Sequence, residues 1–453
     1  MNFERLREQL AGIVGTDHIV AAESCAPYVV DDQIPGAVVF PANVQELAEI
    51  MMLASSERLS VIPRGSGTKI GLGRVPERVD LVVGLTQLKQ IIDHEPGDLT
   101  ATFQAGILLC EVQTSLHGSG QFLPFDPAHS EHATIGGILA TNTSGPWRHR
   151  YGTARDLVIG IRVVHADGTI TKGGAKVVKN VSGYDMNKLY VGSLGTLGII
   201  CEATFKLSPL PAVEQTWVAL FSTGEATACV IAQILHSTIV CSRLEFLSSR
   251  AAQSVGRQID CTVADGIVAV AISVGSMPEV VDAQITAIGT LCRREGAIAG
   301  FLVEGSAHDN LWRAISDFSS ASRDGHYRVM LKASVPLTKI LETVHRAEAL
   351  GCDLGMESAT VAEAGCGIVR LCWTGETDAL ERDATFIAKA VEDLRSWVMH
   401  NGGSMVILLA PPAIKMLVDV WGPVGSALSL MQNLKQQFDP QRLLNPGRFV
   451  GGI

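Results

Sequence analysis

The sequence lacks any block of basic residues. Lysine and arginine number 36 against 46 aspartates and glutamates, so the formal net charge at pH 7 is −10. Nucleic-acid binding requires clustered Lys and Arg that neutralise phosphates, so nucleic acid is excluded as a partner. Charged residues make up only 18% of the chain and hydrophobic residues 47%. This ratio excludes disorder and predicts a globular protein.

Long apolar runs are also missing. A membrane span needs roughly 18 apolar residues, and the longest candidate, Ile267–Val274, suits a short buried strand. Residues 1–15 alternate charged and apolar positions at helical spacing, without the apolar segment of a signal peptide. We therefore expect a cytoplasmic protein, which could reach the inner membrane only peripherally, through its partners.

The ten cysteines include no Cys-x-x-Cys pair. Structural zinc sites and iron–sulfur clusters need several converging thiolates, usually with some at short spacing. Scattered cysteines are typical of free thiols that pack as small hydrophobic groups in a reducing compartment. We expect neither a metal site nor an iron–sulfur cluster in this chain.

The N-terminal part alternates strand and helix patterns. Residues 36–41 predict a strand, and Asn43 with Glu46 forms a capping pair for a helix that ends near Arg58. Residues 59–62 predict a second strand that runs into a loop with glycines at positions 65, 67, 71 and 73. This loop matches neither G-x-G-x-x-G nor the Walker motif. Its consecutive N–H groups could hold a pyrophosphate, or the glycines could serve a structural turn alone.

Glycine is concentrated further along, with 12 of the 45 glycines in residues 134–198, among the β-rich runs 157–164 and 191–205. Such density marks backbone that turns tightly or approaches a ligand closely. Pro209 and Pro211 end this region. Strands then alternate with amphipathic helices, such as 336–350 and 378–400. We predict three parts: residues 1–212, 213–417 and 418–453.

Several motifs, in their order along the chain, resemble one known family. They are Leu123–Pro127, Ala133–Ile138, Ala140–Gly145, Lys179–Asp185, Gly192–Ile200, Val418–Pro423, Phe438–Pro440 and Asn445–Arg448. Together they resemble the FAD-binding domain shared by vanillyl-alcohol oxidases and para-cresol methylhydroxylase, and most of all the FAD-binding subunits of bacterial glycolate oxidases. The resemblance implies an α+β fold. A two-lobed FAD-binding domain over residues 1–212 would carry an α/β cap over 213–417, and the tail from 418 would return to close over the flavin.

The resemblance also implies roles for single residues. The first glycine loop would hold the FAD pyrophosphate, a second group would line the flavin and ribityl chain, and a third would meet the adenine. FAD should be bound non-covalently, because the loop offers no histidine for attachment. The pyrophosphate group is Arg64, Gly65, Ser66, Gly67 and Thr68; the flavin group is Asp126, Pro127, Thr134, Gly137, Thr141, Ser144 and, from the tail, Asn445; the adenine group is Ile199 and Ile200.

The sequence departs from catalytic relatives of this family at two motifs. Relatives that oxidise 2-hydroxy acids carry H-x-G-D-G-N-x-H, whose side chains bind a metal and place a base beside the substrate hydroxyl. Here residues 363–370 read Glu-Ala-Gly-Cys-Gly-Ile-Val-Arg, so Glu363 and Arg370 replace the two histidines. The later Glu-His position reads Leu408-Leu409. Because leucines neither ligate metal nor transfer protons, that chemistry cannot be carried over, and we predict no metal ligands.

Other polar groups are weaker candidates. His129 and His132 flank the predicted flavin loop, and either could be a base or a solvated loop histidine. Arg323, Arg328 and Lys332 could grip a carboxylate, or could be exposed charges on a strand.

Three functions remain open for a FAD-dependent oxidoreductase of this kind. The first is an electron-relaying subunit, working between a catalytic flavin subunit and an iron–sulfur subunit in a complex that oxidises glycolate or D-lactate. The second is a self-sufficient dehydrogenase of a small 2-hydroxy acid. The third is a scaffold subunit that FAD stabilises without catalysis.

Overall fold

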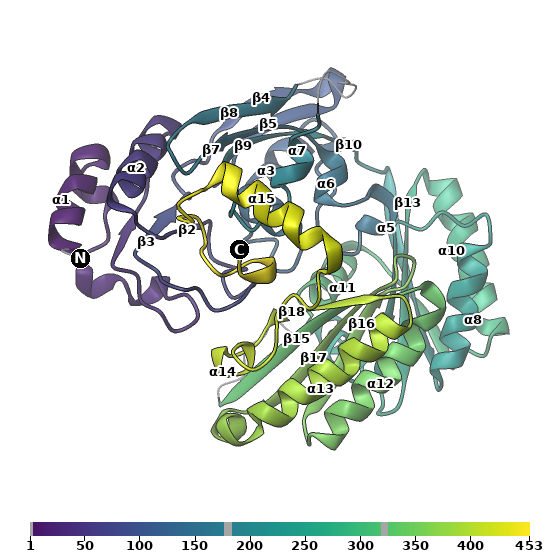
Figure 1. Cartoon of the computed structure of the whole chain (residues 1–453). Helices are drawn as coiled ribbons and strands as arrows, with labels where there is room; N and C mark the ends of the chain where they lie inside the picture. Colours follow the sequence, from purple (N-terminus) through teal and green to yellow (C-terminus); the bar gives the residue numbers. More distant parts are fainter. Residues whose placement is uncertain (1–2, 176–183, 319–324) are drawn as a thin grey trace.

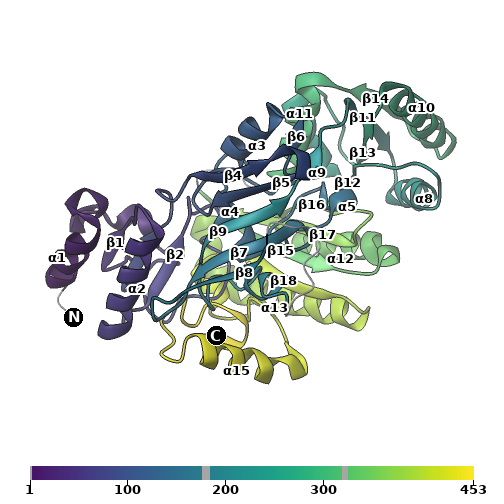
Figure 2. The ribbon, with the colours of Figure 1, turned by 90° about the horizontal axis from the view of Figure 1, so that it is seen from above.

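A two-lobed N-terminal domain and a cap form the two main bodies of the molecule (Figure 1). The computed structural model describes residues 3–175, 184–318 and 325–453. Most of the predicted motif Lys179–Asp185 and the candidate Arg323 lie outside the described residues. Seen from above, the first lobe lies at one end of the molecule and the outermost helices of the cap at the other (Figure 2).

The first lobe contains a parallel sheet that ends at the predicted glycine loop. Its long helix begins where predicted. The side chain of Asn43 accepts a hydrogen bond from the N–H of Glu46 at 2.9 Å, while the carboxylate of Glu46 accepts one from the N–H of Ala42 at 2.7 Å. In spatial order the strands are β1 (Ala37–Val39), β3 (Leu81–Gly84) and β2 (Val61–Arg64), packed against α1 (Phe3–Val14) and α2 (Val44–Glu57).

The second lobe contains an antiparallel sheet. The strand expected over residues 191–205 begins only at Ile199, because Gly192 and Gly195 have φ values of +82° and +68°, which do not fit a strand. In spatial order the sheet is β4 (Ile91–Glu95), β5 (Thr100–Gln104), β9 (Ile199–Lys206), β7 (Val158–Val164) and β8 (Ile170–Gly174); a separate pair joins β6 (Gln121–Phe122) to β10 (Ser208–Pro209), and the helices are α3 (Leu109–His117), α4 (Ile135–Thr141), α5 (Arg148–Tyr151), α6 (Ala154–Leu157) and α7 (Asn187–Tyr190).

The cap mixes strands and helices as the sequence predicts, and each strand pairing described in its sheet is antiparallel. Among the described residues the spatial order is β14 (Ala299–Val303), β11 (Val213–Phe221), β13 (Val268–Ser276), β12 (Arg243–Leu247), β16 (Glu357–Glu363), β17 (Ile368–Glu376), β15 (His326–Ser334) and β18 (Ser404–Leu409). The cap helices are α8 (Gly224–Leu235), α9 (Ser249–Gly256), α10 (Pro278–Arg294), α11 (Gly305–Ser316), α12 (Ile340–Asp353), α13 (Leu380–His400) and α14 (Pro412–Lys415).

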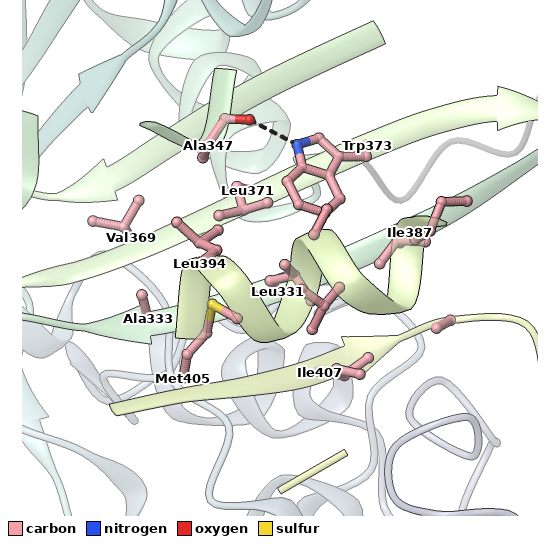
Figure 3. Close-up of a cluster of buried hydrophobic side chains, with 14 of the residues drawn as sticks. Leu331, Ala333, Ala347, Val369, Leu371, Trp373, Ile387, Leu394, Met405 and Ile407 are labelled. Carbon is pink, nitrogen blue, oxygen red and sulfur yellow. Dashed lines mark hydrogen bonds between the residues drawn. The ribbon is translucent and has the colours of Figure 1, made fainter. Parts of the chain in front are cut away.

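The two faces of the cap sheet differ in what covers them. Helices α8, α10, α12 and α13 cover one face and bury a large apolar core. Within it, the fully buried Trp373 donates an indole hydrogen bond to the carbonyl of Ala347 at 3.0 Å (Figure 3). Helices α9 and α11 cover part of the opposite face. The rest of that face meets the N-terminal domain, through ion pairs such as that between Arg148 of α5 and Glu363 of β16.

The C-terminal segment returns to the N-terminal domain across helix α15 (Leu428–Phe438) (Figure 1). Beyond α15 it runs parallel to β2, because Val61 donates to the carbonyl of Leu443 and accepts from the N–H of Asn445. The predicted boundary at residue 212 falls between β10 and β11, and the one at 417 shortly after α14; both divisions stay predictions. None of the described helices has the length and apolar composition needed to cross a bilayer.

Candidate functional site

The glycine-rich loop that follows β2 forms one wall of a cavity in the N-terminal domain. Gly67 and Gly73 have φ values of +88° and +101°, a region that L side chains rarely adopt. Among the described residues, no hydrogen bond engages the backbone N–H groups of residues 65–68. Consecutive free N–H donors in a tight turn suit an anion such as a pyrophosphate.

The cavity brings together residues that lie far apart in the sequence. From the predicted cofactor-binding set it is lined by Arg64, Gly65, Ser66, Gly67, Thr68, Thr134, Gly137, Thr141 and Asn445. It is also lined by Lys69, Leu194 and Arg448, which the residue-by-residue prediction did not include. The Asn445–Arg448 motif was the available signal for Arg448.

Two buried cationic side chains anchor the glycine loop through its backbone carbonyls. Arg448 donates to the carbonyl of Leu72 at 2.7 Å and also to that of Ile70, and its burial lowers its pKa to about 10. Lys415 donates to the carbonyl of Gly71 at 2.6 Å and forms an ion pair with Asp31 at the same distance. The loop is therefore anchored through its carbonyls, which leaves its N–H groups available for a ligand.

Asn445 fixes the tail at the edge of the cavity. Its side chain donates to the carbonyl of Leu194 at 2.6 Å and accepts from Arg448 at 3.1 Å. Asn445 has a φ of +47°, which asparagine tolerates better than most residues. These bonds explain why asparagine is suited to this position.

Asp126, Pro127 and Ser144, which were also predicted to bind the flavin, are not among the residues that line the cavity; they lie in the segments that border α4 and α5. The N–H of Trp147 donates to both carboxylate oxygens of Asp126, at 3.1 and 3.0 Å. A Cβ added to Gly145 would lie 1.9 Å from the carbonyl oxygen of Asp126, so only glycine fits there. The Ser144 hydroxyl and the Asn142 side-chain oxygen are buried without a hydrogen-bond partner. Such orphaned polar atoms indicate a missing polar ligand or water.

The environment of Asp126 leads to a pH-dependent stability. Burial raises its pKa to about 7, against the opposing charge of Arg243 and the bonds from Trp147. The folded-state pKa lies above the unfolded value of 3.8, so the protonated form of Asp126 stabilises the folded protein. This contribution is complete below about pH 4 and is lost as pH rises through about 7. We expect Asp126→Asn to remove that part of the pH dependence in FAD-free protein.

The check is urea unfolding of the wild type and Asp126→Asn at about pH 5 and about pH 8. The variant should lose less stability than the wild type between these two values. Asp260→Asn, at an exposed position, should behave like the wild type. An unchanged pH dependence in Asp126→Asn would show that Asp126 ionises normally.

The two residues predicted to meet the adenine lie in apolar cores and not at the cavity. Ile199 is 1% exposed and packs in the core of the first lobe, while Ile200 is 4% exposed and packs in the core of the second. Successive residues of β9 point to opposite faces, so the two side chains separate. Neither is among the residues that line the cavity, and their contact with adenine stays a prediction.

The cap presents a charged surface to this region, where the resemblance placed the metal-and-base motif. Glu363 lies 3.5 Å from the Nε of Arg148 and 3.8 Å from that of Arg370. Arg370 also donates to the carbonyls of Ser316 and Ile315, at 3.1 and 3.2 Å. Among the described residues, no group of three His, Cys, Asp or Glu side chains is placed to hold a metal ion. Arginine–glutamate contacts occupy this part of the interface.

The remaining candidates lie around the same interface. The N–H of His129 donates to Asp317 of the cap at 2.5 Å, and burial lowers the pKa of the His129 imidazole. Lys332 and Arg328 lie on the face of β15 that does not join the main apolar core. Leu409 faces the glycine loop, since its side chain lies 3.0 Å from the place a Cβ would take on Gly71.

The residues present fit FAD. The loop offers free N–H donors for a pyrophosphate, and the orphaned oxygens of Asn142 and Ser144 can accept hydrogen bonds, the Ser144 hydroxyl also donating one. No histidine occurs in residues 65–69, so non-covalent binding agrees with the residues available.

Comparisons with known proteins agree with this geometry. Residues 35–174 match a family described as FAD binding domain, and residues 210–406 and 415–449 match FAD linked oxidases, C-terminal domain. The chain is 30% identical to the glycolate oxidase subunit GlcD of Bacillus subtilis over 92% of this chain and 89% of the relative. It is 28% identical to a D-lactate dehydrogenase of Archaeoglobus fulgidus over 91% of each.

Solved structures support the fold. The 4-ethylphenol oxidase of Gulosibacter chungangensis superposes with a TM-score of 0.77 at 13% identity, covering 98% of this chain and 96% of the other. The structure of p-cresol methylhydroxylase gives 0.76 at 15% identity with the same coverage. The expected α+β architecture of the para-cresol methylhydroxylase type is confirmed. With both parts of the chain matched, this protein belongs to the FAD-linked oxidases, a family of oxidoreductases, and FAD is its cofactor.

Proposed function

We propose that this chain is the FAD-binding, electron-relaying subunit of a complex that oxidises a small 2-hydroxy acid such as glycolate or D-lactate. Electrons would arrive from a catalytic flavin subunit and leave to an iron–sulfur subunit. The complex would be cytoplasmic, and any membrane contact would be made by the partners. The substrate class rests on relatives named glycolate oxidase subunit and D-lactate dehydrogenase.

One observation supports the relay role: predicted FAD-binding residues line one cavity, whereas in the described part of the cap an ion-paired glutamate and two leucines replace the metal ligands and base of catalytic relatives. The proton of a substrate hydroxyl requires a base within hydrogen-bond reach as hydride leaves for the flavin. At the positions matched to the metal-and-base motifs, Glu363 contacts two arginines, and Leu408 and Leu409 carry no polar atoms. When bound, FAD supplies the electron-carrying chemistry; the chain binds it, orients it and shields it from water.

A second candidate is a self-sufficient 2-hydroxy-acid dehydrogenase. It is favoured by His129, whose lowered pKa keeps its imidazole neutral and able to accept a proton. Lys69, which lines the FAD cavity, contributes to that lowering through its charge. In this case His129 would serve as the base on the loop that precedes α4.

An anaerobic visible spectrum of the chain purified alone separates these functions. We expect flavin bands that persist after addition of glycolate or D-lactate and bleach with dithionite, because the chain would hold FAD without oxidising the acid itself. Bleaching by either acid would favour the dehydrogenase, and its loss in His129→Gln but not in His132→Gln would identify the base. A colourless protein that takes up no added FAD would contradict both.

A further inference from the structure

Two glutamates face each other at the interface between the cap and the N-terminal domain. Glu245 on β12 and Glu363 on β16 are direct register partners in the antiparallel pair, so their Cβ atoms lie on the same face, within about 5.5 Å. They are 1% and 2% exposed. Opposed like charges destabilise a sheet, and burial makes a second negative charge costly.

The two nearby arginines form ion pairs with Glu363, whereas Glu245 has no hydrogen-bond partner among the described residues. Glu363 has Arg148 at 3.5 Å and Arg370 at 3.8 Å. Both oxygens of Glu245 are buried without a hydrogen-bond partner. Arg243, on the same strand, is already paired with Glu214 at 3.0 Å.

The charges around the pair come from several elements. Facing it are Asp126 of the segment before α4, Arg148 of α5, Lys332 of β15 and Arg370 of β17, with the thiol of Cys366 beside them. Burial and the adjacent Glu363 raise the pKa of Glu245 well above its ordinary value; burial also raises the pKa of Glu363, against the opposing charges of Arg370 and Arg148. Two carboxyls so placed hold one proton between them.

The pair is electrostatically linked to the FAD cavity. Arg370 contacts Glu363. Its charge, together with burial, which has the larger effect, lowers the pKa of Lys69, and Lys69 lines the cavity. On the other side, the charge of Asp126 also raises the pKa of Glu245, and the Asp126 carbonyl oxygen lies against Gly145, the residue that follows Ser144. In this enclosed region a charge gained by the cofactor is only weakly screened.

We propose that Glu245 and Glu363 form a proton-holding pair, which binds one proton in the resting protein and takes up a second from water when two electrons enter the bound FAD. The only bond formed in the pair is the O–H of the second carboxyl group. It breaks again, releasing the proton to water, when the electrons leave. The pair thus offsets the negative charge that reduction brings into the interface. This inference rests on FAD binding and not on the relay role.

The test is a spectroelectrochemical titration of the FAD-loaded full-length protein, with electrons supplied by an electrode. The dependence of the flavin midpoint potential on pH gives the number of protons taken up with each two electrons. At slightly alkaline pH, where reduced FAD in water has already lost its more acidic proton, we expect two protons for the wild type. We expect one for Glu363→Gln, because the protonated Glu245 that remains has no ionised partner to protonate. We expect two for Glu245→Gln, in which a neutral amide replaces the protonated carboxyl and Glu363 stays ionised.

Glu376→Gln, at the exposed end of β17, is the matched control and should keep the wild-type count. A count of two in Glu363→Gln would overturn the proposal. If the variants do not fold, the wild type alone decides through its infrared difference spectrum between oxidised and reduced states. A new carboxylic-acid C=O band on reduction, shifted in D₂O, is expected, and its absence would contradict the pair. Either outcome is independent of whether glycolate or D-lactate bleaches the flavin.

Discussion

Replacing Asp439 by alanine is expected to lower the free energy of unfolding by about 3–5 kcal/mol, the cost of leaving one partner of a buried ion pair alone. Lys435 and Asp439 are 2.6 Å apart, with side chains only 5% and 0% exposed. Asp439 also accepts hydrogen bonds from the N–H groups of Leu443 and Leu444, at 3.0 and 2.7 Å. The substitution removes three interactions and leaves the buried Lys435 ammonium without a counter-charge, with the carbonyls of Thr196 and Leu444 as its remaining hydrogen-bond partners.

Urea unfolding followed by circular dichroism measures this effect. Asp378→Ala, at an exposed position, is the control and should stay within about 0.5 kcal/mol of the wild type. The double variant Lys435→Met with Asp439→Leu should recover part of the loss, since an apolar pair can replace a buried ion pair. A loss below about 1 kcal/mol in Asp439→Ala would mean that water reaches Lys435.

The second large effect is expected at the cofactor. Gly67→Ala should weaken FAD binding about tenfold or more, because an L residue in the left-handed region costs about 1–2 kcal/mol and 1.4 kcal/mol is a factor of ten. The added Cβ would also lie 2.6 Å from the guanidinium of Arg64, which stacks over the ring of Tyr28 at 4.9 Å. Arg64 would have to leave its place at the cavity.

Titration of FAD-free protein with FAD, followed by quenching of flavin fluorescence, measures the affinity. Gly120→Ala provides a matched control, because Gly120 has a φ of +66° with no atom within 4 Å of the added Cβ, and lies outside the cavity. It should lose some stability but keep the wild-type affinity for FAD. Equal affinity in Gly67→Ala and the wild type would remove the glycine loop from the FAD site.

Local features were predictable from the sequence because neighbouring residues determine them. Asn43 and Glu46 cap α2 through bonds that span only a few residues. The glycine loop needs positive φ angles that its own residues supply. The family resemblance then placed the two-lobed fold, since its motifs keep their order along the chain.

Contacts between distant segments were not predictable in this way. Nothing near Lys415 in the sequence indicates that it holds the carbonyl of Gly71. Ile199 and Ile200 look equivalent in the sequence, yet the pleat of β9 sends them into two different cores. One sequence feature of Glu245 was missed: it is the single acidic residue within the otherwise apolar run Leu244–Leu247. Its meaning depends on Glu363, more than a hundred residues away.

The way in which Asn445 and Arg448 complete the cavity also sets an order of events during synthesis on the ribosome. The glycine loop and α4 are synthesised first. The donors to the carbonyls of Ile70, Leu72 and Leu194 are Arg448 and Asn445, which are synthesised hundreds of residues later. Contacts of such long sequence separation form late in folding. With FAD bound in this cavity, as we propose, the nascent N-terminal domain alone would lack two residues of its binding site, and we expect flavin to load only after Arg448 has been translated and the tail has folded back.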